Sequence, residues 1–443
     1  MRKAHLLFDG PEGYTENNRY PYTGASPKFV GFLKEYLLKY SDVISFISIA
    51  IYLFNNFELH KLFRELAEKG VQINVVSIPL EGYDHSSPQA ITHSGGSLAL
   101  NNKHTKYSLA SIIYQDFMEK PLENYHLYLF PHTYIRSPRI KPFSRGKMPY
   151  SLHTKSFFIE FKNGDMVSGL TSSNLAMRDL VKHDTFLLRE VATGEGKSTK
   201  AFFSHLASAS VPINDFRQNK TDAFNYPIRQ QVCPATGESH FVAPFYINSA
   251  EKAEQIIIDL MQTAQQRICV MAQHISAFDY SVPLNFKTGG QTGVRVKRKG
   301  MLHTLLEKGK QGVEVVCISQ TYVCSPGKGQ DFRKPANQSN FINFIREFRK
   351  LPNPKYFVND AIHSKYIIVD DKVVVTTFNY TPTQFISLPY VKIDKFEHIE
   401  GLAYKGVFSE VGQLIQLSSK QDVACFKRNF LYVQQSKGTV RVI

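Results

Sequence analysis

Apolar and polar residues alternate along the chain with helical and strand periods, and the same order of segments occurs twice. Apolar positions three and four residues apart predict amphipathic helices, whereas short continuous apolar runs predict buried strands. In the first half we predict helices over residues 27–38, 57–69 and 108–118 and strands over 43–52, 71–78 and 127–130. In the second half we predict helices over 250–265, 301–309 and 337–349 and strands over 267–273, 313–319 and 356–358. The pattern indicates a duplicated unit.

Alternating helices and strands predict an α/β fold in which helices flank the sheets. Residues 197–239 are rich in Ser, Lys, Asn, Gln and Gly, so we expect the two units to join there. We place the boundary near residue 230. This gives an N-terminal lobe of residues 1–230 and a C-terminal lobe of residues 231–443.

Each half ends in a strand that carries a histidine and a lysine two residues apart. The first reads SLHTKSFFIE from Ser151 to Glu160, and the second reads AIHSKYIIVD from Ala361 to Asp370. Side chains two apart on a strand point to the same face. His153 and Lys155 therefore form one pair, and His363 and Lys365 form the other.

A return strand follows each motif and ends in hydroxyl residues and an asparagine. The first motif spans residues 153–174 and returns to Ser172 and Asn174, and the second spans 363–379 and returns to Thr377 and Asn379. A similar HTK triplet at His104 has no such return strand. The paired residue types suit a phosphate group: Lys supplies charge, Asn and hydroxyls donate hydrogen bonds, and His attacks or donates a proton near neutral pH.

Two HxK blocks with returning asparagines resemble the motifs of the phospholipase D superfamily, HxKxxxxD followed by GSxN. The resemblance implies two similar α/β/α lobes, each a mixed sheet flanked by helices, that face each other across a pseudo-twofold axis. It also implies one composite site that hydrolyses phosphodiesters without metal or other cofactor. By family analogy, His153 is the nucleophile that forms a phosphohistidine and His363 is the general acid. Lys155, Lys365, Asn174 and Asn379 would clamp the phosphate, with Ser172 and Thr377 as further phosphate ligands.

Each histidine also needs a carboxylate that fixes its tautomer. In the resemblance this acid follows the asparagine by ten or more residues, and Asp184 and Glu400 occupy such positions. Glu160 stands where the family has Asp. We expect Glu160 and Asp370 to be structural, because seven residues of strand place them about 20 Å from the histidine.

Composition narrows the class of protein. The 443 residues are 43% hydrophobic and 21% charged, which is ordinary for a globular protein. Five scattered cysteines without a CxxC pair argue against a disulfide framework or a zinc site.

No run of about 18 apolar residues predicts a membrane span, and no signal peptide is evident, so we expect a cytoplasmic protein. The net charge of +15 favours a polyanionic partner.

Two basic segments, interpreted as loops, direct the substrate prediction toward nucleic acid, with DNA preferred. Their candidate contact residues are Arg136, Arg139, Lys141, Arg145, Lys147, Arg295, Lys297, Arg298 and Lys299. We predict a nuclease of genome defence or repair. A helicase or another such partner would have to supply any energy-dependent step, because the chain lacks an ATP-binding loop.

Two alternatives stay open: a phospholipase D or phosphatidyltransferase on anionic membranes, and a catalytically weak nucleic-acid-binding scaffold. Both motifs lie in one chain, so a monomer is sufficient to build the site. A homodimer is also compatible with the sequence.

Overall fold

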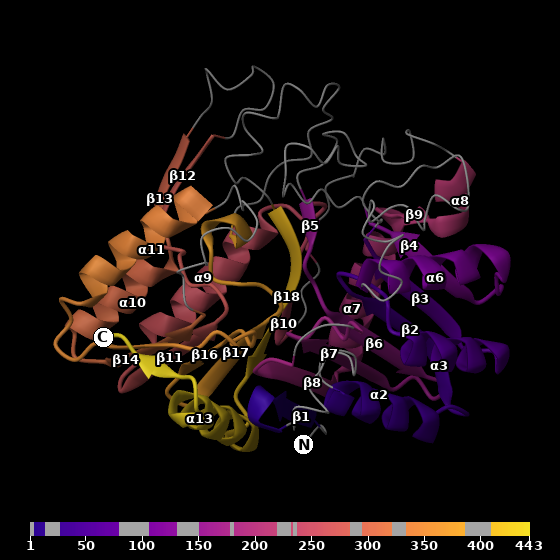
Figure 1. Ribbon diagram of the computed structural model, residues 1–443, viewed down its shortest axis with the longest axis horizontal. Coiled ribbons are helices and arrows are strands. Elements are labelled where there is room, and N and C mark those ends of the chain that lie inside the picture. Colours follow the sequence, from indigo (N-terminus) through magenta and orange to yellow (C-terminus); the bar gives the residue numbers. More distant parts are fainter. Residues whose placement is uncertain are drawn as a thin grey trace.

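Two α/β lobes stand side by side, each built on one large mixed sheet (Figure 1). The computed structural model describes residues 4–13, 27–78, 106–130, 150–177, 181–218, 232–233, 237–283, 295–320, 334–385 and 409–443. Helices flank the sheets, and apolar side chains from both lobes meet between them.

The first sheet has the strand order β1-β8-β7-β6-β2-β3-β4-β9. Its strands are β1 (Ala4–Asp9), β2 (Ile44–Ala50), β3 (Gln72–Ser77), β4 (Tyr125–Leu129), β6 (Ser156–Phe161), β7 (Met166–Thr171), β8 (Asp184–Glu190) and β9 (Val211–Pro212). The accompanying helices are α2 (Pro27–Lys39), α3 (Phe57–Glu68), α6 (Lys106–Glu119), α7 (Thr193–Ser208) and α8 (Ile213–Gln218), with a 3₁₀ turn η1 (Pro11–Gly13). Strands β2, β3 and β4 are parallel to one another, and the other neighbours are antiparallel.

The second sheet repeats this arrangement strand for strand, in the order β10-β18-β17-β16-β11-β14-β15-β19. Its strands are β10 (Ser239–Val242), β11 (Arg267–Ala272), β14 (Glu314–Ser319), β15 (Lys355–Val358), β16 (Tyr366–Val369), β17 (Lys372–Thr376), β18 (Ser409–Leu417) and β19 (Val440–Arg441). Its helices are α9 (Ser249–Gln262), α10 (Met301–Lys310), α11 (Lys334–Phe348) and α13 (Lys420–Gln435), with η2 (Pro382–Gln384). The parallel strands are again three neighbours, β11, β14 and β15. The duplication predicted from the sequence is confirmed.

The motif strands β6 and β16 are central in their sheets because antiparallel neighbours flank each of them. The whole of β16, YIIV, is buried, which explains its continuous apolar run. Each HxK motif therefore lies immediately before a strand that is held on both edges. A strand fixed in this way has little freedom to move, so the residues that lead into it are well suited to carry a site.

Backbone pairing and stacked rings join the lobes. Strand β5 (Tyr150–Leu152), just before His153, pairs parallel with the start of β18 in the second sheet. The Phe202 ring on α7 stacks on Phe241 of β10, with ring centroids 4.2 Å apart. The β8 residue Arg189 also reaches Ser239 of β10. The lobes thus share a continuous interior rather than a flexible hinge.

The predicted helices and strands are present, with ends within a few residues of the predicted ones. The polar region 197–239 begins with most of α7, whose Phe202 and Phe203 are buried, so its first part belongs to the folded body. One expectation was wrong. The basic segment around residue 297 is strand β13 (Arg295–Lys299), paired with β12 (Asp279–Pro283), and not a loop. The boundary near residue 230 lies outside the described residues and stays a prediction.

Candidate active site

The backbone of His363 is held by the opposite lobe. The carbonyl of His183 accepts hydrogen bonds from the N–H groups of His363 and Ser364, at 3.1 and 2.7 Å. His183 also pairs with Ile362 in a parallel bridge. The residue after His183 is Asp184, which opens β8. These backbone contacts therefore place Asp184 directly beside the imidazole of His363.

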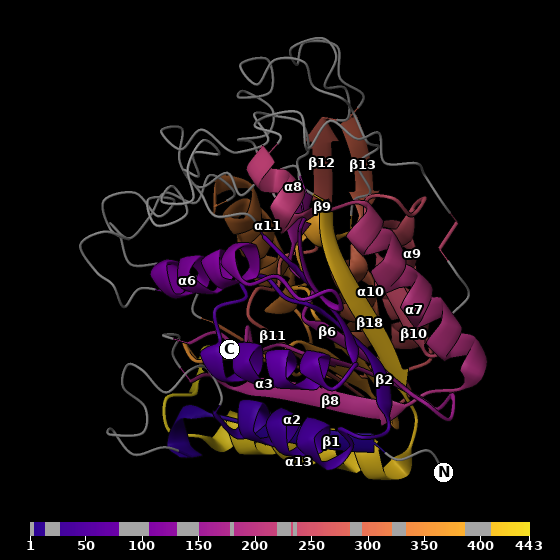
Figure 2. The ribbon, with the colours of Figure 1, turned by 90° about the vertical axis from the view of Figure 1, so that its right-hand side faces the viewer.

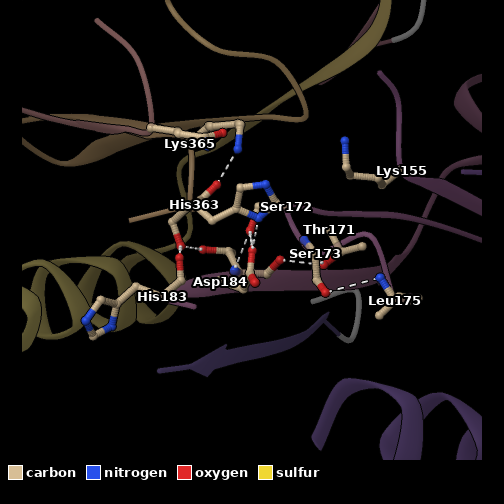
Figure 3. Close-up of polar contacts among 12 residues, drawn as sticks. Lys155, Thr171, Ser172, Ser173, Leu175, His183, Asp184, His363 and Lys365 are labelled. Atoms are coloured by element: carbon tan, nitrogen blue, oxygen red, sulfur yellow. Dashed lines mark hydrogen bonds and ion pairs between the residues drawn. The ribbon is translucent and has the colours of Figure 1, made fainter. Parts of the chain in front are cut away.

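Asp184 and His363 form a buried pair across the lobe interface (Figure 3). His363 Nδ1 lies 2.7 Å from Asp184 Oδ1, and the two side chains are 7% and 2% exposed. The Ser172 hydroxyl donates to the same Asp184 oxygen over 2.5 Å and accepts from the N–H of Thr185. A carboxylate in this position fixes the imidazole tautomer.

His153 has the mirrored arrangement. Its Nδ1 lies 3.2 Å from Glu410 Oε2, at ion-pair distance, and its side chain is 22% exposed whereas that of Glu410 is 5% exposed. Glu410 is the second residue of β18 and pairs with Ser151 of β5. Each histidine therefore takes its carboxylate from the sheet of the other lobe.

Glu410 was missed in the sequence because the two lobes do not supply the carboxylate from equivalent positions. The hydroxyl of Thr377 accepts from Gln413 N–H just as Ser172 accepts from Thr185 N–H, so Gly412 is the counterpart of Asp184. A Cβ at Gly412 would collide with the ring of Phe378. The carboxylate comes instead from two residues earlier, on the longer Glu side chain. The predicted partner Glu400 lies outside the described residues.

The two motif lysines are buried next to the histidines. Lys155 Nζ donates to the carbonyl of His153 over 2.8 Å, and Lys365 Nζ donates to the carbonyl of His363. The lysines are 1% and 0% exposed. Burial, reinforced by the neighbouring Lys155 cation, holds the pKa of Lys365 well below its usual value, although Asp184 and Glu410 act in the opposite direction.

Burial also raises the pKa of Asp184, against the Ser172 hydrogen bond and the cations of Lys365, Lys182 and Lys155. Lys155 and Lys365 come from different lobes, yet both act on this carboxylate. In Figure 3, Lys365 lies next to His363, and Lys155 stands to the right of this pair. The two motif lysines and the His363–Asp184 pair therefore share one electrostatic neighbourhood.

The hydroxyl groups expected to bind phosphate have other partners. Ser172 and Thr377 are 1% and 0% exposed, and their hydroxyls bind Asp184 and the next strand of the sheet. Ser172 therefore orients a carboxylate, and Thr377 holds the backbone of β18. Their role as phosphate ligands stays a prediction.

Each asparagine lies just past its return strand. Asn379 is 7% exposed, and its Oδ1 accepts from His274 N–H over 3.2 Å, which aims its amide nitrogen elsewhere. Asn174 is partly exposed.

The acidic residue seven positions after each histidine lies far from this chemistry. Asp370 accepts hydrogen bonds from the N–H groups of Gln265, Gln266 and Arg267 and so fixes the turn that leads into β11. Its φ of 48° requires a residue that tolerates the left-handed region, as Asp does. Glu160 pairs with Lys200 on α7. Both acids stabilise the fold, in agreement with the expectation from strand length.

Of the basic residues predicted to bind nucleic acid, those from Arg136 to Lys147 lie outside the described residues. Those from Arg295 to Lys299 form β13. In the described part of the chain, no group of three or more His, Cys, Asp or Glu side chains is placed to hold a metal ion. No described helix is long and apolar enough to cross a membrane.

Duplicated sheets of identical strand order, with one HxK motif at the start of a central strand in each, define the fold of the phospholipase D superfamily, and this chain has that fold. No protein-family model and no curated protein sequence matches the chain. Solved structures do match. Phosphatidylserine synthase of Haemophilus influenzae superposes with a TM-score of 0.52 over 99% of this chain and 89% of that one, at 14% identity.

Polyphosphate kinase of Porphyromonas gingivalis gives a TM-score of 0.52 over 98% of this chain, at 8% identity. The present chain spans about half of that kinase, 51% of its length. At such identities the likeness shows the fold alone.

Proposed function

We propose that the protein is a phosphodiesterase that works through a phosphohistidine intermediate and acts on nucleic acid. The observation that carries the proposal is the crossed pair of imidazoles: His363 with Asp184, and His153 with Glu410, each joined at Nδ1 across the lobe interface. Two oriented imidazoles in one site provide a nucleophile and a general acid. A merely structural histidine pair would not need two buried lysines beside it.

The reaction would follow from this geometry in two steps. Nε2 of His153, the more exposed ring, attacks phosphorus, and the bond from phosphorus to the leaving oxygen breaks as His363 gives that oxygen its proton. His363, now neutral, takes a proton from water, which attacks the phosphohistidine and releases His153. Asp184 and Glu410 stabilise the imidazolium forms during the cycle.

Lys155 and Lys365 would supply the positive charge that the phosphate oxygens need. Their burial removes competing water, so each cation interacts more strongly with an entering anion than it would at the surface. Burial first, and then repulsion by the Lys155 cation, hold the pKa of Lys365 below its usual value. A phosphate diester relieves this repulsion, which favours binding.

Nucleic acid, with DNA preferred, is the substrate class that the charge favours, since the chain carries +15 overall. We also propose a cytoplasmic setting in genome defence or repair, beside a helicase or similar partner. One chain provides both motifs, so a monomer is sufficient for catalysis and a homodimer is compatible.

A phosphatidyl transferase is the second candidate, because phosphatidylserine synthase of H. influenzae matches this chain over almost its whole length. In that case the same two imidazoles would exchange one alcohol for another on a lipid phosphate. A scaffold that binds nucleic acid without turnover is the third candidate.

An assay in EDTA separates the three candidates. Labelled single- and double-stranded DNA and RNA are incubated with wild type, His153→Ala and His363→Ala, in parallel with anionic vesicles. Cleavage of nucleic acid by wild type alone supports the proposal. Headgroup release without nucleic-acid cleavage would establish the lipid enzyme, and salt-sensitive binding without turnover on either substrate would establish the scaffold.

A further inference from the structure

We propose that the two-stranded segment formed by β12 and β13, residues 279–283 and 295–299, is a DNA-duplex-binding element fixed to the active site. We call it the basic ribbon. The proposal rests on the proposed function, since it assigns the substrate of that same site. Its strands pair antiparallel from Asp279 opposite Lys299 to Pro283 opposite Arg295, and they form a sheet separate from the two large ones.

The basic ribbon is tied to the candidate phosphate clamp by a short run of backbone. Asn379 Oδ1 accepts from His274 N–H, and the next residue, Tyr380, accepts at its carbonyl from Ser276 and Ala277, at 2.7 and 2.9 Å. Tyr380 N–H in turn donates to the carbonyl of His274 over 3.1 Å. Only a few residues separate these hydrogen bonds from Asp279. At about 3.4 Å per residue, the start of the ribbon lies within about 20 Å of Asn379.

The base of the ribbon is packed rather than loosely tethered. Gly300 N–H donates to the carbonyl of Phe278 over 2.5 Å, and a Cβ on Gly300 would run into the carbonyl of Ala277. The rings of Phe278 and His303 stack with centroids 4.1 Å apart, and His303 Nε2 lies 2.9 Å from Asp279 Oδ1. A rigid base means that a duplex bound to the ribbon has a defined position relative to the histidines.

Figures 1 and 2 show where the ribbon points. It rises beyond the helices of the second lobe, and in Figure 1 it lies at the same end of the molecule as β5. In both views the upper end of β18 lies toward the same end of the molecule as the ribbon. Strand β5 leads directly into His153, and it pairs with the first residues of β18, where Glu410 lies. A polyanion lying along the ribbon is therefore at the active-site end of the protein.

The charge of the ribbon is concentrated on one strand. Strand β13 reads RVKRK, four cations in five residues, whereas β12 reads DYSVP and has one carboxylate, which is already paired with His303. Arg295, Lys297 and Lys299 occupy alternate positions in the sequence of the strand, at intervals of about 7 Å along its backbone. Cationic residues spaced regularly along a strand match a row of phosphates better than they match a planar lipid surface.

The shape of the ribbon selects B-form DNA among the polyanions. A two-stranded β-ribbon fits the major groove of B-form DNA and can contact the phosphates that border it. The major groove of double-stranded RNA is deep and narrow, so an RNA duplex would not admit the ribbon. A single strand has no groove to hold it. We therefore infer that the site receives double-stranded DNA.

The test compares two fourfold variants that lose the same charge. The ribbon variant carries Arg295→Gln, Lys297→Gln, Arg298→Gln and Lys299→Gln. The control carries Lys69→Gln, Lys310→Gln, Lys372→Gln and Lys420→Gln, at four exposed lysines on other elements. A third variant, Arg295→Lys with Arg298→Lys, keeps the ribbon charge. It checks that an effect of the ribbon variant comes from lost charge and not from a folding defect caused by substitution in the ribbon. Binding of a labelled DNA duplex is measured in a His363→Ala background, and hydrolysis of bis(4-nitrophenyl) phosphate is measured in the active background.

We expect the ribbon variant to bind the duplex at least about tenfold more weakly near 0.1 M salt. The slope of log K against log salt should shrink by roughly 2 to 3, because about three phosphate contacts are lost. The control and the charge-retaining variant should bind like wild type, and hydrolysis of the small diester should not change. If the ribbon variant binds duplex DNA like the control, the inference is wrong.

Three further results would also overturn the inference: an equal loss of affinity for an RNA duplex, a loss confined to single strands, or a loss of binding to anionic vesicles with duplex binding kept. The binding and hydrolysis measurements also separate this inference from the proposed function. If wild type hydrolyses neither the small diester nor DNA, the proposed function fails, while the binding comparison still decides the role of the ribbon.

Discussion

Asp184 Oδ1 and His363 Nδ1 lie 2.7 Å apart although 179 residues separate them in the sequence and they come from different lobes. The same crossing recurs between Glu410 and His153. Neither lobe alone therefore holds a complete imidazole–carboxylate pair. The site exists only when both lobes are folded and docked, which makes the lobe interface part of the chemistry.

Removal of the Asp184 charge should impair catalysis without removing the His363 ring. We expect Asp184→Asn to lower kcat by about 10²–10⁴-fold, because the imidazole loses the partner that fixes its tautomer and stabilises its cation. Hydrolysis of a phosphodiester in EDTA measures the effect. Asp371→Asn, at an exposed aspartate, is the matched control. Near-wild-type turnover in Asp184→Asn would show that His363 does not depend on this carboxylate.

Glu410 should be the partner of His153 in activity as it is in the structure. We expect Glu410→Gln to lower kcat by about 10-fold to 10³-fold, less than Asp184→Asn because the pair is longer and its histidine is more exposed. Glu307→Gln, an exposed residue on α10, is the control. The assignment of Glu410 is wrong if Glu400→Gln abolishes turnover while Glu410→Gln does not.

Ser172 and Thr377 occupy equivalent places, yet their substitution should have different effects. Ser172 donates to a carboxylate, and such a bond is worth about 1.5–3 kcal/mol, so Ser172→Ala should lower kcat by roughly 10- to 100-fold with little change in KM. Thr377→Ala removes only a brace of β18 and should lower the free energy of unfolding by about 1 kcal/mol. A rise in KM with unchanged kcat in Ser172→Ala would restore the phosphate-ligand interpretation.

The pH dependence should show the state of Lys365. Its pKa lies well below the usual lysine value because of burial and the nearby Lys155. The cation that binds phosphate is therefore lost as pH rises through this lowered pKa, and kcat/KM should fall there rather than near the ordinary lysine pKa. Lys365→Arg keeps its charge at all these pH values, so kcat/KM should no longer fall with rising pH, although the rate should be lower overall. Lys372→Arg is the control. If kcat/KM of Lys365→Arg falls at the same pH as that of wild type, the group that titrates is a histidine.

Stability and activity should depend on pH in opposite directions. Because the folded state holds the Lys365 proton less tightly than the unfolded state, the stability contributed by Lys365 is lost as pH falls through the lowered pKa. Lys365→Met should therefore raise the free energy of unfolding at neutral pH while it abolishes turnover. Urea denaturation across this pH range measures the change.

Asp370 should matter for stability and not for chemistry. Burial acts to raise the pKa of its carboxyl, but three backbone donors outweigh burial and hold the pKa below its usual value. Its contribution to stability is thus present above the ordinary Asp pKa and is lost as pH falls through the lowered one. We expect Asp370→Asn, which tolerates the positive φ, to lower the free energy of unfolding by about 1–2 kcal/mol. Turnover by the folded variant should stay within about twofold of wild type, and a loss comparable to that of Asp184→Asn would contradict this role.

Much of the fold was accessible from the sequence because local patterns carry it. The helical spacing of apolar residues in α3 and the apolar run of β16 each follow from which face of the element is buried. Strands without such a signal were missed. Strand β5 has only three residues and is held by its pairing with β18, and β13 is a run of cations paired with β12. These two segments are strands because they pair with other strands of the same chain, and local composition does not reveal such pairing.

The sequence by itself determined the duplication, the paired HxK motifs and the identity of His153, Lys155, His363 and Lys365 as candidate residues, because repetition and strand period are written in residue order. Only the tertiary structure decided which carboxylate serves which histidine. Gly412 stands where symmetry would place an acid, and the packed ring of Phe378 excludes a side chain there, so the charge comes from Glu410. Such a choice depends on the space between two docked lobes, and residue spacing along one chain contains no measure of that space.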